Sequence, residues 1–331
     1  MKMDGREGSG GDESPPPLLK RGWVYQERLL SPRVLHFCRR ELLFECRAGN
    51  QCQCGEREPE VGPKEIFAQL LTGDAALDSR QSHRGWWAMT RQYSQLRLTF
   101  EKDVLLALSG IAWRIGDTRP AEDDYLCGIW KSTLPYGLLW YVPDPNLESP
   151  AGSYPQRASD PRVPSWSWAS IVGPIRWWLP SPHWNRNLVE VDHAQCTTDT
   201  GDGYGQVVGA SLKLTGPILA SELAWQPLVS RPPGDRKEPN NASTWHLPAL
   251  SELANRPVDS EYSFHPDFAL FTEQASPISV RCLWFKPDMA LVLRPTDEGK
   301  FERIGLVHDW GGGELLTSQQ LRQLLGTIKV V

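Results

Sequence analysis

Three cysteines form a C-x5-C-x-C cluster near the start of the sequence, at Cys46, Cys52 and Cys54. With His36 or His83 as a fourth ligand, these thiols would supply the donor atoms of a tetrahedral zinc site. The spacing lacks the paired C-x2-C knuckles that are typical of structural zinc sites. We therefore interpret the cluster as three reduced thiols in and beside a loop, and we expect no metal.

Carboxylates are the second group of side chains that could do chemistry here. Glu27, Glu41 and Glu45 are close in sequence, and a pair of carboxylates can serve as general acid and general base. Nothing in their spacing fixes a common geometry. We therefore interpret them as surface glutamates and predict no catalytic residue.

Glycine-rich stretches could be mistaken for phosphate-binding loops. The sequences GDGYG at 201–205 and GGG at 311–313 share only their composition with such loops. A phosphate-binding loop follows a strand and opens a helix, and neither stretch does so. Both stretches therefore predict turns and no cofactor. His265-Pro266-Asp267 also predicts a turn, because no helical hairpin surrounds it.

The composition limits the classes of protein to consider. A chain of 331 residues with 40% hydrophobic content can bury a sizeable core, and its net charge of −5 gives no general attraction to nucleic acid. No run of about 18 apolar residues could span a membrane. No secretory signal precedes the seven cysteines, an odd number. We expect a globular protein of the reducing cytoplasm.

Hydrophobic periodicity predicts an α+β fold for the chain. The first residues are too polar to offset the entropy of ordering them, and the second half alternates short β-prone runs with turns. The predicted regions are a disordered leader over 1–20, a helix and hairpin over 21–62, a Trp-rich helical region over 63–180, and a mostly antiparallel β-rich region over 181–331 with a polar insertion near 226–260.

The first structured region predicts a helix over 22–30, which Pro32 ends. The runs VLHFC and ELLFEC predict an antiparallel hairpin, and a polar loop over 47–64 follows it. Alternation separates two faces of the hairpin, with Leu35 and Phe37 on one and Val34 and His36 on the other.

The Trp-rich region predicts mainly helices. Residues 82–95 place Trp86, Met89 and Tyr93 on one face. The clearest helix starts at Thr99 as N-cap and ends at Gly116. DDYLCGIW predicts a further helix, and PSWSWASI predicts a strand with its two indoles on one face.

The fifteen tryptophans are the most unusual feature of the composition. Indole faces stack on sugars and bases, so a carbohydrate-binding module is one interpretation. Many of these tryptophans lie at core-compatible spacing on predicted helices and strands. We therefore favour aromatic packing between a helical layer and a sheet.

Several ordered motifs resemble the fungal heterokaryon incompatibility (HET) domain proteins. They are a Trp-x-x-Gln-Glu-Arg-x-Leu-Ser-Pro-Arg element, Tyr-Ser before Leu-Thr-Phe-Glu-Lys-Asp, an Ala-Leu-Ser-Gly-Ile-Ala helix, and Pro-Ser-Trp-Ser-Trp-Ala-Ser. The resemblance covers residues 21 to 173 and, more loosely, FERIGL near the end. The motif residues are Trp23, Gln26, Glu27, Arg28, Leu30, Ser31, Arg33, Asp103, Ser109, Gly110, Trp166 and Trp168.

The resemblance implies a Toll/interleukin-1 receptor-like α/β module that takes part in non-self recognition and associated cell death. In that family the Trp-Gln-Glu element closes the module, after an upstream Leu-Ser-Tyr-x-Trp-Gly strand that this sequence does not contain. We therefore expect a C-terminal remnant of the HET domain. Its helix over 22–30 would lack the sheet on which it docks.

Two hypotheses follow from the resemblance. The first is a truncated, non-catalytic interaction or regulatory module whose partner is a protein, either a second copy or another HET-type or signalling protein. The alternative is the C-terminal part of a full HET effector, with an NAD-cleaving core that is missing from the gene model. Without the sheet, the region would self-associate through an exposed apolar patch that consists of Trp23, Leu29, Leu30, Leu35 and Phe37.

Overall fold

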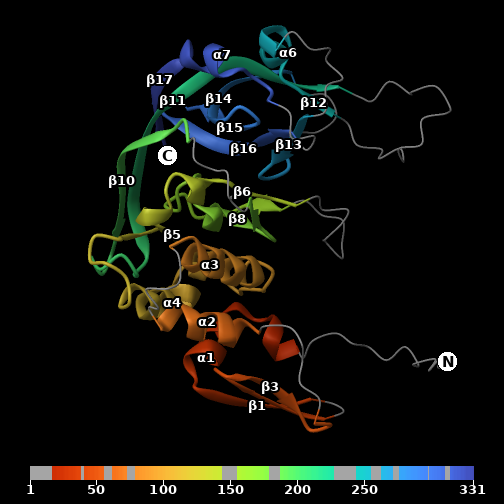
Figure 1. Cartoon of the computed structure of the whole chain (residues 1–331), viewed down its shortest axis with the longest axis vertical. Helices are drawn as coiled ribbons and strands as arrows, with labels where there is room; N and C mark the ends of the chain where they lie inside the picture. Colours follow the sequence, from red (N-terminus) through yellow and green to blue (C-terminus); the bar gives the residue numbers. More distant parts are fainter. Residues whose placement is uncertain are drawn as a thin grey trace, which may run out of the picture.

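The computed structural model describes residues 17–38, 41–55, 62–72, 79–143, 155–178, 187–226, 244–254, 262–270, 276–296, 298–309 and 314–331. It combines helices with many antiparallel strands, which confirms the mixed α+β class. Figure 1 shows a small sheet at one end, then a layer of helices, a middle layer of short strands, and a large sheet at the other end. Most of the expected leader, the glycine run and most of the polar insertion lie outside the described residues.

The small sheet at one end contains the predicted hairpin. The elements here are η1 (Pro17–Lys20), α1 (Gly22–Leu30), β1 (Arg33–Phe37), β2 (Leu42–Cys46) and β3 (Gly49–Cys52). The strands pair antiparallel in the order β1-β2-β3. Leu35 and Phe37 lie on the exposed face and Val34 and His36 on the half-buried face, as alternation predicts.

Two expectations for this region were wrong. The end of the predicted leader is the 3-10 helix η1, because the backbone N–H of Arg97 donates to the carbonyl of Lys20 at 2.7 Å and fixes it. The predicted polar loop contains β3. Gly49 has a φ of 139°, which lets the chain reverse directly after β2 and pair again.

The helical layer consists of α2 (Pro63–Leu71), α3 (Ser79–Tyr93), η2 (Glu101–Asp103) and α4 (Leu106–Gly116). Trp86, Met89 and Tyr93 are buried on α3, which confirms their predicted common face. The predicted start at Thr99 is wrong, because η2 first forms a separate turn and α4 begins only at Leu106.

The predicted helix in DDYLCGIW is instead a short hairpin of β4 (Tyr125–Leu126) and β5 (Ile129–Trp130). At its turn Cys127 and Gly128 have φ angles of 49° and 97°, the left-handed conformation that tight hairpins require. The carbonyl of Gly128 accepts hydrogen bonds from the indoles of Trp86 at 3.1 Å and Trp168 at 2.9 Å. These contacts from distant residues stabilise the turn, and helical periodicity does not show them.

The predicted strand in PSWSWASI is also wrong. These residues form a turn followed by η5 (Trp168–Ser170), and Ser167 caps it by accepting from the backbone N–H of Ala169 at 3.1 Å. Serines and indoles are all buried, so no alternation between two faces exists. The other short elements of the middle layer are η3 (Lys131–Thr133), η4 (Tyr136–Leu138), β6 (Trp140–Tyr141), β7 (Gln156–Arg157), β8 (Ile171–Val172) and β9 (Arg176–Trp177).

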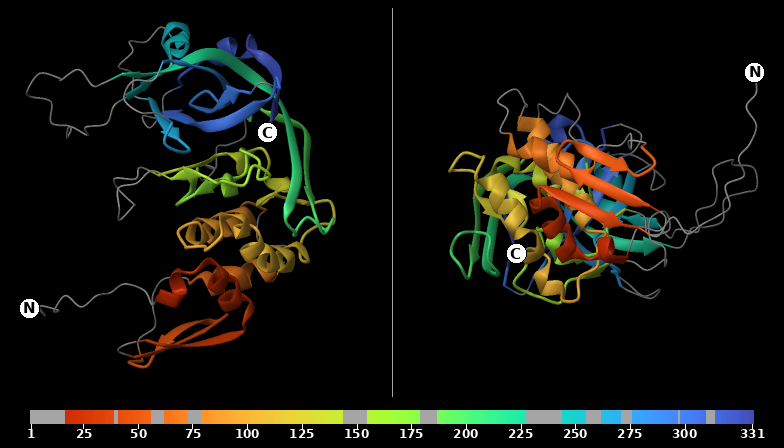
Figure 2. Two further views of the ribbon diagram at one scale, coloured as in Figure 1. Left: turned by 180° about the vertical axis from the view of Figure 1, so that it is seen from behind. Right: turned by 90° about the horizontal axis from the view of Figure 1, so that it is seen from below.

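The large sheet confirms the predicted β-rich second half. Its elements are β10 (Glu190–Thr198), β11 (Val207–Gln226), β12 (Thr244–His246), α6 (Pro248–Ala254), β13 (Tyr262–Pro266), β14 (Ile278–Lys286), β15 (Met289–Pro295), β16 (Phe301–Asp309), α7 (Ser318–Arg322) and β17 (Leu325–Val330). Neighbouring strands pair antiparallel except for one parallel pair between β16 and β17. With that pair, the strands β11, β14, β15, β16 and β17 form a closed ring in which each strand is hydrogen-bonded to the next. Figure 2 shows the long β10–β11 hairpin reaching from this sheet toward α4.

The predicted turn at His265-Pro266-Asp267 is wrong, since the first two residues belong to β13, which pairs with β16. Asp267 follows the strand and is buried against Arg303. The chain closes with the short helix α7 and the strand β17.

Aromatic packing fills the core between the helices and the sheet. Both faces of β14, β15 and β16 are buried, against two apolar clusters. Eight indoles confirm the packing interpretation, whereas Trp23 and Trp113 are 39% and 51% exposed. The eight are at most 7% exposed, and they are Trp86, Trp87, Trp130, Trp140, Trp166, Trp168, Trp177 and Trp284. Among the helices of the described ranges, none is long and apolar enough to cross a membrane.

Candidate interaction site around helix α1

Helix α1 docks on α4 through residues of the family motif. The backbone N–H of Gly110 donates to the Gln26 side-chain oxygen at 2.7 Å, and the Trp23 indole donates to the carboxylate of Asp103 at 3.2 Å. Leu29 is fully buried at this joint. In place of the expected missing sheet, α4 and α2 supply a docking surface for α1. The predicted apolar patch was therefore wrong in including Leu29, which is buried.

The remaining motif residues have separate local roles. The carbonyl of Glu27 accepts bonds from the backbone and hydroxyl of Ser31, which end α1. Glu27 and Arg33 are exposed, and Leu30 is half-buried against α4. Ser109 donates to the carbonyl of Leu106 within α4, and Trp166 and Trp168 lie apart from α1 in the middle layer.

A Gly110→Ala substitution tests the joint between α1 and α4. A Cβ at this position would lie 2.9 Å from the Gln26 side-chain oxygen and 3.2 Å from Leu30 Cδ1. Alanine is the better helix former, but displacing Gln26 from a packed joint is expected to lower the free energy of unfolding by about 1 to 2 kcal/mol. Urea unfolding measures this, with Gly209→Ala as control because no atom lies within 4 Å of its added Cβ. A Gly110→Ala protein as stable as the wild type would contradict the assignment.

The buried carboxylate of Glu45 ties the small sheet to α1. Its two oxygens accept bonds from Arg28 at 2.6 and 2.7 Å, and one of them lies 3.1 Å from His36 Nε2. Lys64 of α2 is also buried and donates to the backbone carbonyls of Arg28 and Ser31. Burial raises the pKa of Glu45, but Arg28, His36 and Lys64 outweigh burial and hold the pKa below its ordinary value. We call these four side chains the Glu45 cluster.

The surface interpretation is thus wrong for Glu45 and confirmed for Glu27 and Glu41, which are exposed. The hydrogen-bond partners of Glu45 are basic side chains and not the other glutamates, so no carboxylate pair forms there. Lys64 belongs to none of the sequence motifs. Lys64 is spaced by three residues from Phe67, and Phe67 by three from Leu70, which places all three on the buried face of α2.

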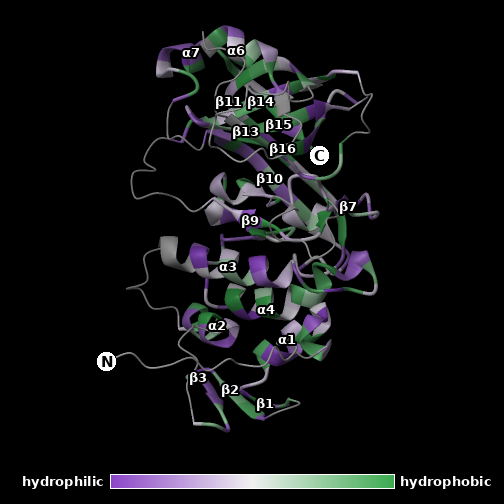
Figure 3. Ribbon diagram, turned by 90° about the vertical axis from the view of Figure 1, so that its right-hand side faces the viewer, coloured by the Kyte–Doolittle hydropathy of each residue, from purple (hydrophilic) through white to green (hydrophobic). Residues whose placement is uncertain are grey.

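The opposite side of the small sheet is an exposed apolar surface. Phe37 is 80% exposed, Leu35 49% and Phe44 38%, and Leu35 pairs directly with Phe44 across the strands. We call these three side chains the outer face. Figure 3 shows β1, β2 and β3 at the end of the molecule with no other labelled element beyond them. The outer face therefore has no partner within the described chain.

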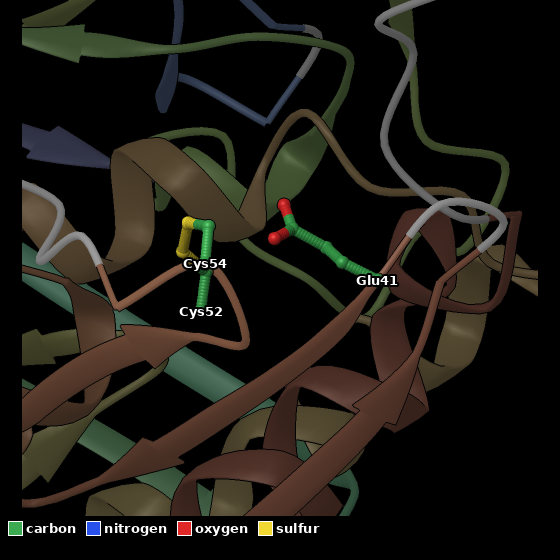
Figure 4. Close-up of side chains that lie close together, drawn as sticks. All are labelled: Glu41, Cys52 and Cys54. Atoms are coloured by element: carbon green, nitrogen blue, oxygen red, sulfur yellow. A yellow bond between two sulfur atoms is a disulfide. The ribbon is translucent and has the colours of Figure 1, made fainter.

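The cysteine cluster does not form the set weighed for zinc. Cys52 and Cys54 form a disulfide, whereas Cys46 is a free thiol. The interpretation as three reduced thiols is therefore wrong for two of them. His36 lies at Glu45 and His83 lies on α3. Figure 4 shows the side chain of Glu41 beside the disulfide.

A separate cavity of about 400 Å³ lies beside the C-terminal end of α3. Two segments that overlap the family motifs, 93–98 and 168–174, supply most of its mainly apolar lining. Glu101 also lines it and accepts hydrogen bonds from Ser159 at 2.9 and 2.7 Å, which lower the pKa of the Glu101 carboxyl. The cavity has the size of a small-ligand site, but its carboxylate is already held by Ser159.

The fold and this site define a mixed α+β protein with an exposed apolar sheet face that a buried charge cluster holds in place. Comparisons with models of protein families, with curated proteins and with solved structures found no match to this chain. The proposal for the function is therefore based on the outer face and the Glu45 cluster.

Proposed function

We propose that this chain is a HET-family interaction module without catalytic activity, related to fungal non-self recognition and associated cell death, and that its outer face binds a second copy of the chain. The exposed outer face is the observation that carries the proposal. Its strands are held to α1 on the other side by the Glu45 cluster, so the surface is presented in one orientation. The motif pairs Gln26 with Gly110 and Trp23 with Asp103 support the family assignment by giving each residue a partner.

A second copy is the partner that this surface fits most directly. The three side chains of the outer face are apolar, and the exposed Arg33 lies at the start of β1 on the same face. In a two-fold dimer one patch serves both subunits, and two sheets pack face to face about 10 Å apart. Phe37 and Leu35 of one copy would then be buried by those of the other.

A Phe37→Ser substitution is expected to weaken self-association at least about tenfold, because burying a phenylalanine contributes about 1.5 to 3 kcal/mol. Sedimentation equilibrium over a range of concentrations measures the dissociation constant. Phe100→Ser is the matched control, since Phe100 is 59% exposed and lies outside the small sheet. A wild-type chain that stays monomeric at all concentrations would overturn the proposed dimer.

The non-catalytic part of the proposal has its own test. The purified chain is incubated with NAD, and release of nicotinamide is followed by chromatography. No release above the rate of a buffer blank is expected. Turnover of NAD would show that the chain is an enzyme and would overturn this part, whatever its state of association.

A further inference from the structure

We propose that Cys52 and Cys54 form a reversible thiol–disulfide site that exchanges with low-molecular-weight thiols of the glutathione type. The pair lies at the end of β3, where Cys54 is exposed and Cys52 is half-buried. Exchange requires a thiolate to reach one of the two sulfur atoms. The exposure of Cys54 meets this requirement, and the site is independent of the outer face.

The disulfide contributes little to holding the fold together. Only Gln53 lies between its two cysteines, whereas the second disulfide of the protein joins residues 69 positions apart, Cys127 and Cys196. The stabilisation from a disulfide grows with the length of the loop that it closes. Backbone bonds already fix this segment, since Cys52 pairs with Leu43 and the N–H of Gln53 donates to Leu42 at 2.9 Å. The bond between Cys52 and Cys54 can therefore open while the sheet stays intact.

The exchange proceeds in two balanced steps. A glutathione thiolate attacks the sulfur of Cys54, a mixed disulfide forms, and Cys52 leaves as a thiolate that takes a proton from water. A second glutathione thiolate attacks the glutathione sulfur of the mixed disulfide. Glutathione disulfide leaves, and the Cys54 thiolate is protonated in turn. Two electrons pass from two thiols to the protein disulfide, and the reverse sequence restores it.

Glu41 sets the rate of this exchange. A carboxylate oxygen of Glu41 and the sulfur atoms of Cys52 and Cys54 all lie within 4.8 Å of one another, and Figure 4 shows them together. A negative charge at this distance repels the incoming thiolate and the thiolate that leaves. Glu41 thus slows reduction of the pair through its negative charge.

The disulfide between the buried Cys127 and the half-buried Cys196 provides an internal control for the test. The native chain is equilibrated in buffers of increasing ratio of reduced to oxidised glutathione, quenched with acid, alkylated and analysed by peptide mass spectrometry. Cys52 and Cys54 are expected to become alkylated together, while Cys127, at 1% exposure, stays bonded to Cys196. The proposal is overturned if both disulfides open at the same ratio, if Cys52 and Cys54 are alkylated at every ratio, or if the purified protein holds zinc on them.

The Glu41→Gln variant tests the role of the carboxylate. Removing one charge about 5 Å from the reacting sulfurs is expected to speed reduction by glutathione about fourfold at low salt, with a smaller difference at high salt. Glu27→Gln is the matched control, because it removes the same charge from an exposed position on α1. Equal reduction rates for the two variants would overturn the role of Glu41.

Discussion

An Asp267→Asn substitution is expected to lower the free energy of unfolding by about 3 to 5 kcal/mol. The side chains of Asp267 and Arg303 are 1% and 0% exposed, and they form an ion pair at 2.9 Å. Arg303 also donates to the backbone carbonyls of Leu138 and Trp140. Removing the carboxylate charge leaves a guanidinium that is buried without a counter-charge.

Chemical denaturation followed by tryptophan fluorescence measures this loss. Arg294→Gln is the control, because it breaks the partly exposed pair with Glu302 and is expected to cost less than about 1 kcal/mol. The double variant Asp267→Asn with Arg303→Met removes both charges and is expected to recover part of the loss. An Asp267→Asn protein no less stable than Arg294→Gln would contradict the argument.

The Asp267–Arg303 pair also illustrates what the sequence does not reveal. Arg303 lies in FERIGL, and the sequence around Asp267 predicts a turn. No local pattern joins Arg303 of β16 to a residue that follows the separate strand β13. The same cause explains the error at 123–130. There two indoles from distant elements bond to the carbonyl of Gly128 and stabilise a hairpin turn in place of a helix.

Elements with local signals were predicted well. Pro32 ends the helix over 22–30, and strict alternation in β1 separates its exposed face from its half-buried face. The site was predicted only in part. Gln26 and Gly110 were identified as motif residues, but their mutual hydrogen bond requires the packing of α1 on α4. Glu45 was placed on the surface because a lone glutamate is usually exposed, and its basic partners come from other elements.

A Glu45→Gln substitution is the second change with a large expected effect. Glu45 is fully buried and is the carboxylate that faces Arg28 and the buried Lys64. The amide that replaces it carries no charge, so the two cations remain without compensation. We expect a loss of about 3 kcal/mol in the free energy of unfolding at neutral pH. Denaturant unfolding measures the loss, with Glu27→Gln on the exposed side of α1 as the control of equal chemistry.

The pH dependence of stability separates the charge of Glu45 from its shape. Burial raises the pKa of this carboxyl, but Arg28, His36 and Lys64 lower it by more, so its folded-state pKa lies below the ordinary value of 4.5. A lowered pKa means that the stabilisation is fully present above the ordinary value and is lost as the pH falls through the folded-state pKa. The wild type and Glu27→Gln should therefore lose stability in this acid range more steeply than Glu45→Gln. Parallel pH profiles for all three proteins would show that the charge of Glu45 does not hold the small sheet on α1.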